Sequence, residues 1–163
     1  MRHARLALLA AIFANGLATP AIAAQTTAVT TVSVVRPVSI SKLQDMDFGS
    51  LAFAGFTGTR TITLSRAGTM TCATDIVCSG VPKQARFNVR GTNKMVVLLT
   101  YSGGTLSNGV DSIPFTADGP ASITMINSGA PGLDFDVGGV LTISPTLVGG
   151  VYSGTMTVTA DYQ

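Results

Sequence analysis

The last stretch of the chain, residues 149–163, reads GGVYSGTMTVTADYQ and decides the fold class. Apolar and polar residues alternate along it, which is the period of a strand that is buried on one face and wet on the other. The inward parity consists of Tyr152, Gly154, Met156, Val158, Ala160 and Tyr162. Ser, Thr and Asp fill most of the other parity. We therefore predict a closing antiparallel β-strand over the whole stretch.

The remaining sequence favours strands as well. Beyond residue 24, no window carries apolar residues at the spacing of an amphipathic helix, and Gly, Thr, Ser and Val dominate. The spacing of turn residues predicts about eight to ten short strands. We expect an all-β fold, an immunoglobulin-like antiparallel β-sandwich, with barrel closure as the alternative.

Residues 1–24 have the pattern of a secretory signal peptide. Arg2, His3 and Arg5 form a basic start, residues 6–14 are apolar, and residues 20–24 offer a small-residue cleavage site after Ala23 or Ala24. The apolar run is shorter than the roughly 20 residues that span a bilayer. We expect export to the periplasm and then to the cell surface or the outside, without stable membrane insertion.

Charge and composition exclude several classes of function. Removing Arg2 and Arg5 leaves eight basic residues against eight aspartates, so the exported chain is neutral and has no basic block for nucleic acid. The chain has no glutamate, and its single histidine, His3, is in the leader. Catalysis that needs a histidine and zinc sites with histidine ligands are thereby excluded. We expect no enzyme, no cofactor and no metal.

Two aspartate pairs remain as candidates for chemistry. Asp45 and Asp47, and likewise Asp134 and Asp136, are spaced i, i+2. Glycoside hydrolysis needs two carboxyl groups across a cleft, and calcium needs more oxygen ligands than one pair supplies. We interpret both pairs as solvent-facing positions of strands.

The two cysteines of the chain, Cys72 and Cys78, are six positions apart. In an oxidising compartment we predict that they form a structural disulfide, which loop-closure entropy values at about 2.4 kcal/mol. A redox site normally has Cys-x-x-Cys spacing, and a metal site needs more ligands.

Two further patterns predict local structure. Residues 85–90 and 95–101 alternate on either side of Gly91-Thr92-Asn93-Lys94, which predicts a hairpin with Phe87 and Val89 inward and Arg86, Asn88 and Arg90 on a wet face. The motif Val-Gly-Gly-Val occurs at residues 137–140 and again at 148–151. We interpret both copies as bulges or tight turns that use the positive φ open to glycine.

Residues 25–36 form a β-prone arm ahead of the domain that we place at residues 37–163. Residues 26–35 are uncharged and rich in β-branched side chains, and Pro37 follows Arg36, which interrupts a sheet ladder. An uncovered segment of this kind pairs readily with another strand. The arm is therefore a candidate donor strand, with Val29, Val32 and Val34 as its apolar contacts.

Four motifs give the chain a family resemblance. They are Leu-x-x-x-x-Phe-Gly at residues 43–49, Ala-x-Phe-x-Val-x-Gly at 85–91, Val-Gly-Gly-x-Leu-x-Ile at 137–143 and Gly-x-Tyr-x-Gly-x-x-x-Val-Thr at 150–159. With these motifs the chain resembles the secreted bacterial family called domain of unknown function 4402. That family is similar in turn to chaperone–usher pilins and spore-coat-U-type fimbrial subunits, which share a terminal alternating strand and a penultimate tyrosine, here Tyr162.

The resemblance implies a structural subunit that associates with itself into a polymer. In such subunits the arm of one copy completes the sheet of the next, and a periplasmic chaperone and an outer-membrane usher serve assembly. The assembly residues implied here are those of the arm and, in the closing strand, Tyr152, Gly154, Met156, Val158 and Tyr162. A missing strand would leave the sandwich incomplete.

The alternative is a monomeric secreted β-sandwich that binds a carbohydrate or another surface ligand. Sugar sites normally stack the ligand on exposed aromatic rings, yet the chain has no tryptophan and its aromatic residues mostly occupy inward parity. The structural subunit is therefore the leading hypothesis.

Overall fold

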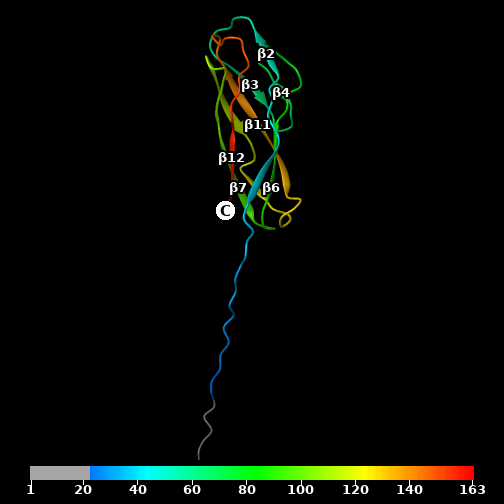
Figure 1. Cartoon of the computed structure of the whole chain (residues 1–163), viewed down its shortest axis with the longest axis vertical. Helices are drawn as coiled ribbons and strands as arrows, with labels where there is room; N and C mark the ends of the chain where they lie inside the picture. Colours follow the sequence, from blue (N-terminus) through cyan, green and yellow to red (C-terminus); the bar gives the residue numbers. More distant parts are fainter. Residues whose placement is uncertain (1–22) are drawn as a thin grey trace, which may run out of the picture. The chain divides into compact units, whose positions relative to one another are not determined.

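The computed structural model describes residues 23–163, so residues 1–22 of the predicted signal peptide lie outside the described part. Within it the chain forms twelve strands, all paired antiparallel, and no helix (Figure 1). The all-β prediction is confirmed. No helix that could cross a membrane occurs in residues 23–163. The strands are β1 (Ser39–Gln44), β2 (Ser50–Phe53), β3 (Arg60–Leu64), β4 (Met70–Thr71), β5 (Ile76–Ser79), β6 (Ala85–Arg90), β7 (Val96–Ser102), β8 (Gly104–Ser107), β9 (Ser112–Asp118), β10 (Ser122–Thr124), β11 (Leu133–Ile143) and β12 (Thr157–Tyr162).

The chain divides after Ser33 into an amino-terminal unit and a compact unit, Val34–Gln163. Residues 23–33 belong to no strand, and their side chains are exposed. Val29 and Val32 are 92% and 87% exposed. In the compact unit, which we call the body, the ladders begin at Ser39, two residues after Pro37.

The larger sheet is organised around β11 and curls as a half-barrel. The first half of β11 pairs with β6, which pairs in turn with β1, and its second half pairs with β3 and β9. At the change of partner stand Gly138 and Gly139, where an added Cβ would overlap the Leu64 carbonyl oxygen and the Phe115 ring. Neither glycine has a positive φ. The interpretation of this Val-Gly-Gly-Val copy as a turn or bulge at positive φ is therefore wrong: close backbone packing excludes a side chain here.

A three-stranded sheet, in the order β10-β7-β12, packs across the core from β6 and β11. The interface consists of Ala85, Phe87, Val89, Val97, Leu99, Met125, Phe135 and Val137, flanked by half-buried Val158, Ala160 and Tyr162. The predicted hairpin of residues 85–90 with 95–101 is wrong. Both edges of β6 are taken by β1 and β11, and both edges of β7 by β10 and β12, so residues 91–95 carry the chain between sheets.

The closing strand is shorter than predicted. β12 pairs with β7 over residues 157–162, and its inward parity agrees with the prediction, because Val158, Ala160 and Tyr162 are half-buried. Residues 149–156 form only an isolated bridge between Ser153 and Ser107. The alternating pattern thus identified the buried face of this stretch but not where its ladder begins.

The predicted disulfide joins Cys72 to Cys78, with the Cα atoms 6.4 Å apart. Cys78 lies in β5, which forms a two-stranded sheet with β2. A second core cluster packs beside this sheet, made of Ile62, Ile76, Ile113, Phe115, Leu141 and Ile143. Met46 and Met156 contact both clusters and join them into one core.

Part of the predicted wet face of β6 is covered. Asn88 is only 8% exposed, because its amide donates to the Pro131 carbonyl at 3.1 Å and to Asp134 Oδ1 at 2.6 Å. Arg86 pairs with Asp136 across the strands at 2.8 Å. Asp134 and Asp136 of β11 therefore bind side chains of the neighbouring strand β6. Within residues 23–163 no group of three or more His, Cys, Asp or Glu side chains could hold a metal.

Candidate functional site: an open groove between two edge strands

Two edge strands flank an opening in the body. β1 is the last strand of the larger sheet and β12 the last strand of the three-stranded sheet. Each pairs with one neighbour, and within residues 23–163 no ladder joins the two. An edge strand presents a row of N–H and C=O groups that can pair with another strand.

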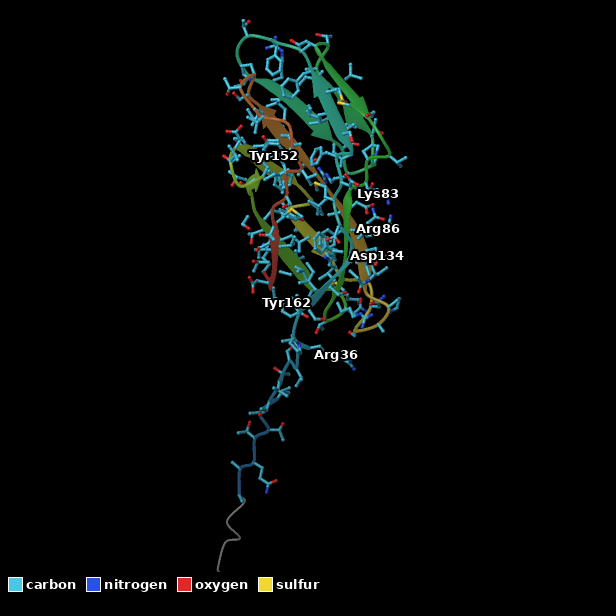
Figure 2. All side chains as sticks on the ribbon, turned by 45° about the horizontal axis from the view of Figure 1, so that its top comes forward. Arg36, Lys83, Arg86, Asp134, Tyr152 and Tyr162 are labelled. Atoms are coloured by element: carbon cyan, nitrogen blue, oxygen red, sulfur yellow. A yellow bond between two sulfur atoms is a disulfide. The ribbon has the colours of Figure 1, made fainter. Side chains whose placement is uncertain are left out.

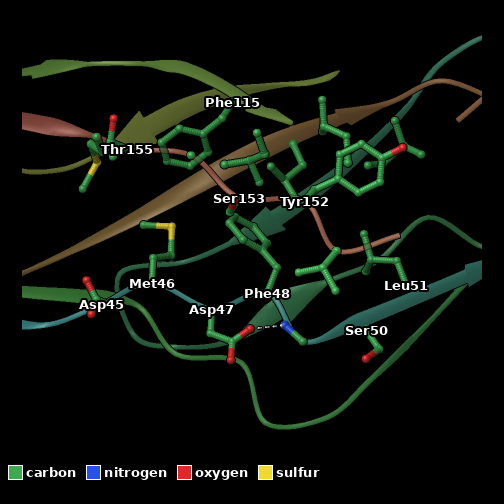
Figure 3. A pocket seen from close by; sticks show the side chains of 18 of the residues that line it. Asp45, Met46, Asp47, Phe48, Ser50, Leu51, Phe115, Tyr152, Ser153 and Thr155 are labelled. Carbon is green, nitrogen blue, oxygen red and sulfur yellow. Dashed lines mark hydrogen bonds between the residues drawn. The ribbon is translucent and has the colours of Figure 1, made fainter. Parts of the chain in front are cut away.

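A groove of about 710 Å³ lies beside the end of β1, and the residues that line it stop at Met156, just before β12 (Figure 3). One wall is formed by most of residues 42–53 and the other by residues 147–156. The floor is apolar and comes from β6, β9 and β11: it consists of Ala85, Phe87, Ile113, Phe115, Leu141 and Ile143. All six are buried core residues that are at most 9% exposed, so the core itself forms the floor of the groove.

The aromatic and sulfur-containing side chains of the walls lean over this floor. Phe48 meets Phe115 edge to face, with ring centroids 6.3 Å apart. Met46, which Figure 3 labels, and Met156 line the groove from opposite walls. Flexible methionines adapt to the shape of an apolar partner, which suits a surface that accepts another segment.

The first wall is turned away from β12 by local backbone contacts. Asp47 exchanges two backbone hydrogen bonds with Lys83, each 2.8 Å long. Its carboxylate accepts the Gly49 N–H at 2.8 Å, and Gly49 has a φ of +71°, a conformation that favours glycine. Asp47 is thus a turn residue, and Asp45 is paired with Lys42 at 2.6 Å.

The second wall is fixed by hydrogen bonds to neighbouring segments. Ser153 exchanges backbone hydrogen bonds of 2.8 and 3.1 Å with Ser107, the last residue of β8. The Tyr152 hydroxyl donates to the Val148 carbonyl at 2.8 Å, and the Val148 N–H donates to Asp111 Oδ2 at 2.9 Å. Burial, and then the nearby Asp111 charge, raise the pKa of Tyr152. These contacts leave the groove-facing edge of this wall without a strand partner.

Tyr162 lies beyond the groove, at the far end of β12. Its hydroxyl donates to the Arg36 carbonyl at 2.7 Å and accepts the Thr92 N–H at 2.6 Å. This contact joins the end of β12 to the chain just before β1 (Figure 2). The sequence pattern placed Tyr162 inward but gave no sign of Thr92 or of the double hydrogen bond, because these residues are far apart in the chain.

The predicted assembly residues fall into three places. Tyr152, Gly154 and Met156 line the groove. Val158 and Tyr162 lie beyond it in β12 and pack on the core. Val29, Val32 and Val34 are exposed. The floor residues were missed as a site, because their alternating pattern predicts core and does not show which core positions stay accessible.

A family model described as "Domain of unknown function (DUF4402)" matches residues 38–162. This chain belongs to the DUF4402 family. The match contains both walls and the floor of the groove and begins after the arm. Searches of curated proteins and of solved structures gave no significant match to the DUF4402 chain.

The groove of this DUF4402 chain is lined by few ionisable side chains. Among its lining residues the ionisable side chains are Lys42, Asp45, Asp47 and Tyr152, and each is hydrogen-bonded within its own wall. The floor provides apolar contacts and the walls provide backbone edges. An extended, apolar and uncharged segment matches both.

Proposed function

We propose that this DUF4402 protein is a structural subunit of a fimbria, pilus or surface coat, assembled by β-strand complementation. The observation that carries the proposal is the groove, where core residues form the floor between residues 42–53 and residues 147–156. A groove with an apolar floor and unpaired backbone along its walls can accept an added strand. In this reading the body is an immunoglobulin-like sandwich that lacks one strand.

The proposed occupant is the stretch of residues 26–35 from a second copy. It contains ten residues, and the wall at residues 147–156 also contains ten. It carries no charge, so its insertion leaves no buried ion. Val32 and Val34 share a parity and would face the floor together. Val29 has the opposite parity and would face outward in a continuous strand.

The position of Arg36, where the arm joins the body, supports a polymer over a closed dimer. Arg36 lies at the Tyr162 end of the body, whereas the groove extends away from that end along residues 147–156. A donor site and an acceptor site at different places on one subunit make a heterologous contact, which repeats into rings or fibres.

The same surface calls for partners before assembly. An exported subunit with an accessible core needs a periplasmic chaperone that covers the groove, and an outer-membrane usher that exchanges this cover for the arm of the next subunit. The signal peptide expected at residues 1–24 supplies the route. No metal or cofactor takes part in this proposal.

A charge scan of the arm tests the proposal. Val32→Asp or Val34→Asp would place a carboxylate against the apolar floor, so we expect these variants of the protein lacking residues 1–24 to stay monomeric. Thr31→Asp and Ser33→Asp are matched controls on the opposite parity and should assemble like the unchanged protein. Size-exclusion chromatography with light scattering measures the outcome.

The competing hypothesis is the monomeric binding module, in which the groove holds a surface ligand. Equal assembly of all four variants would contradict strand donation by this arm. A stable monomer whose arm resists proteases would favour the binding module.

A further inference from the structure

We infer that Tyr162 and Thr92 form a clamp on Arg36 that directs the arm to a second copy and keeps it out of the groove of its own chain. The inference rests on the proposed function. It assigns a positioning role to these two residues: they determine whether the arm enters its own groove or that of a second copy. Their places in the sheet and in the core do not by themselves imply this role.

The clamp occupies both backbone hydrogen-bonding groups of Arg36. The Arg36 N–H donates to Thr92 Oγ1 at 2.7 Å, and the Arg36 carbonyl accepts the Tyr162 hydroxyl at 2.7 Å. The same hydroxyl accepts the Thr92 N–H at 2.6 Å, so the three residues form one closed set. Gly91 gives the tyrosine room, since an added Cβ there would lie 2.7 Å from the hydroxyl oxygen.

Occupation of its own groove would require the arm to fold back on β1. The chain would have to reverse at residues 35–37 and run antiparallel to β1. Pro37 has no N–H for a hairpin, and the residue before a proline is restricted to extended conformations. Because the clamp also holds both backbone groups of Arg36, the reversal would have to break two hydrogen bonds.

Occupation by a second copy meets none of these obstacles. The Tyr162 contact joins the end of β12 to the chain before β1. A strand added between β1 and β12 therefore enters from the opposite end, near Val148 and Val151, and the body of the donor stays there. The donor strand then runs antiparallel to β12 and parallel to β1. A self-inserted arm would run in the opposite direction, which makes the two arrangements distinguishable by which end of the arm lies near Tyr162.

The test compares the full exported chain with Tyr162→Phe, Thr92→Val and the double variant. A net hydrogen bond shifts an equilibrium by about fivefold, so we expect each single variant to raise the monomer fraction several-fold and the double variant to raise it most. Hydrogen exchange should show residues 26–35 protected in these monomers. Cross-links should then join residues 26–29 to the wall near Val148 and Val151 within one chain.

Three controls keep the result interpretable. Tyr101→Phe removes a comparable hydroxyl, which donates to the Pro120 carbonyl at 2.8 Å, and should assemble as before. Thr92→Ser keeps the acceptor oxygen and should also assemble as before. Thr92→Val leaves Tyr162 in place, so it still tests the clamp if loss of the tyrosine hydroxyl unfolds the body.

The outcomes separate this inference from the proposed function. If the unchanged protein assembles and the double variant assembles equally well, without a self-protected monomer, the clamp has no role in partner choice. If the unchanged protein stays monomeric with freely exchanging arm amides, the proposed function fails and the inference falls with it.

Discussion

Gly138 is a position where one atom decides whether β11 can pack. An alanine Cβ there would collide with backbone atoms of Leu64, Ser65 and Arg66, which cannot move independently of β3. We predict that Gly138→Ala lowers the free energy of unfolding by about 2–3 kcal/mol, measured by urea denaturation.

Gly149→Ala is the matched control, because this glycine stands in the second Val-Gly-Gly-Val copy and its added Cβ would meet nothing within 4 Å. We expect a change within about 0.5 kcal/mol. Equal losses for the two variants would contradict the close-packing account.

Asp75 gives the body a pH-dependent contribution to stability. The Arg60 hydrogen bond, at 2.8 and 2.9 Å, lowers the pKa of this carboxyl, and the same contact raises the pKa of Arg60. A carboxyl with a lower pKa in the folded state stabilises the fold above its ordinary pKa of about 4 and loses this contribution as the pH falls through the folded value.

We therefore predict that Asp75→Asn destabilises the protein near neutral pH and that the difference from the unchanged protein disappears in acid. Thermal unfolding at a series of pH values checks this. Asp45→Asn breaks an exposed pair with Lys42 and should matter little at any pH. A difference for Asp75→Asn that grows toward acid would contradict the sign.

The sequence alone did not predict the environment of individual residues, because identical motifs stand in different surroundings. The two Val-Gly-Gly-Val copies differ only in what surrounds them, and at Gly138 and Gly139 the neighbours are Leu64 and Phe115. Asn88 shares its parity with Arg86 and Arg90 yet is buried, because Pro131 and Asp134 cover it. These neighbours are distant in sequence, so no local pattern contains them.

At the scale of elements, alternation predicted strands and their faces but not their partners. The inward parity of residues 152–162 was right, whereas the ladder covers only 157–162. Residues 85–90 and 95–101 were correctly predicted as strands, although they belong to different sheets. Pairing depends on which edge is free after the whole core has formed, and the groove exists for the same reason.

The disulfide is a contact for which the sequence alone predicted both partners. Cys72 and Cys78 enclose a short loop that leads into β5. We predict that the Cys72→Ala/Cys78→Ala double variant loses about 2 kcal/mol of unfolding free energy, by loop-closure entropy, with the ladder of β2 and β5 intact.

Chemical denaturation under non-reducing conditions measures this loss, and amide exchange of residues 50–53 reports on the ladder. A double variant as stable as the unchanged protein would show that the link does not constrain the unfolded chain.

At the scale of the whole molecule, one chain carries both an exposed arm and a groove with an apolar floor. Family membership could be predicted from four short motifs, since these lie in β6, β11, the first wall and the second wall with β12. The groove itself could not be predicted, because its floor residues have the same pattern as any core residue. The groove follows from how residues 42–53 and 147–156 are placed over these core residues, which only the structure shows.

The central claim is that residues 26–35 fill the groove as an added strand, and transplanting the arm tests it most directly. β12 runs away from the groove and ends beside Arg36, so residues 25–35 attached after Gln163 through a flexible linker would run back antiparallel to β12 toward the groove, as we propose for the donor strand.

The measurement is the molar mass by light scattering of two proteins that lack residues 1–35, one without and one with the arm attached after Gln163. We predict that neither forms fibres, that the transplanted protein is a monomer, and that it unfolds at a clearly higher temperature than the armless body. An armless body that forms fibres as readily as the intact protein, or a transplanted arm that adds no stability, would contradict the account.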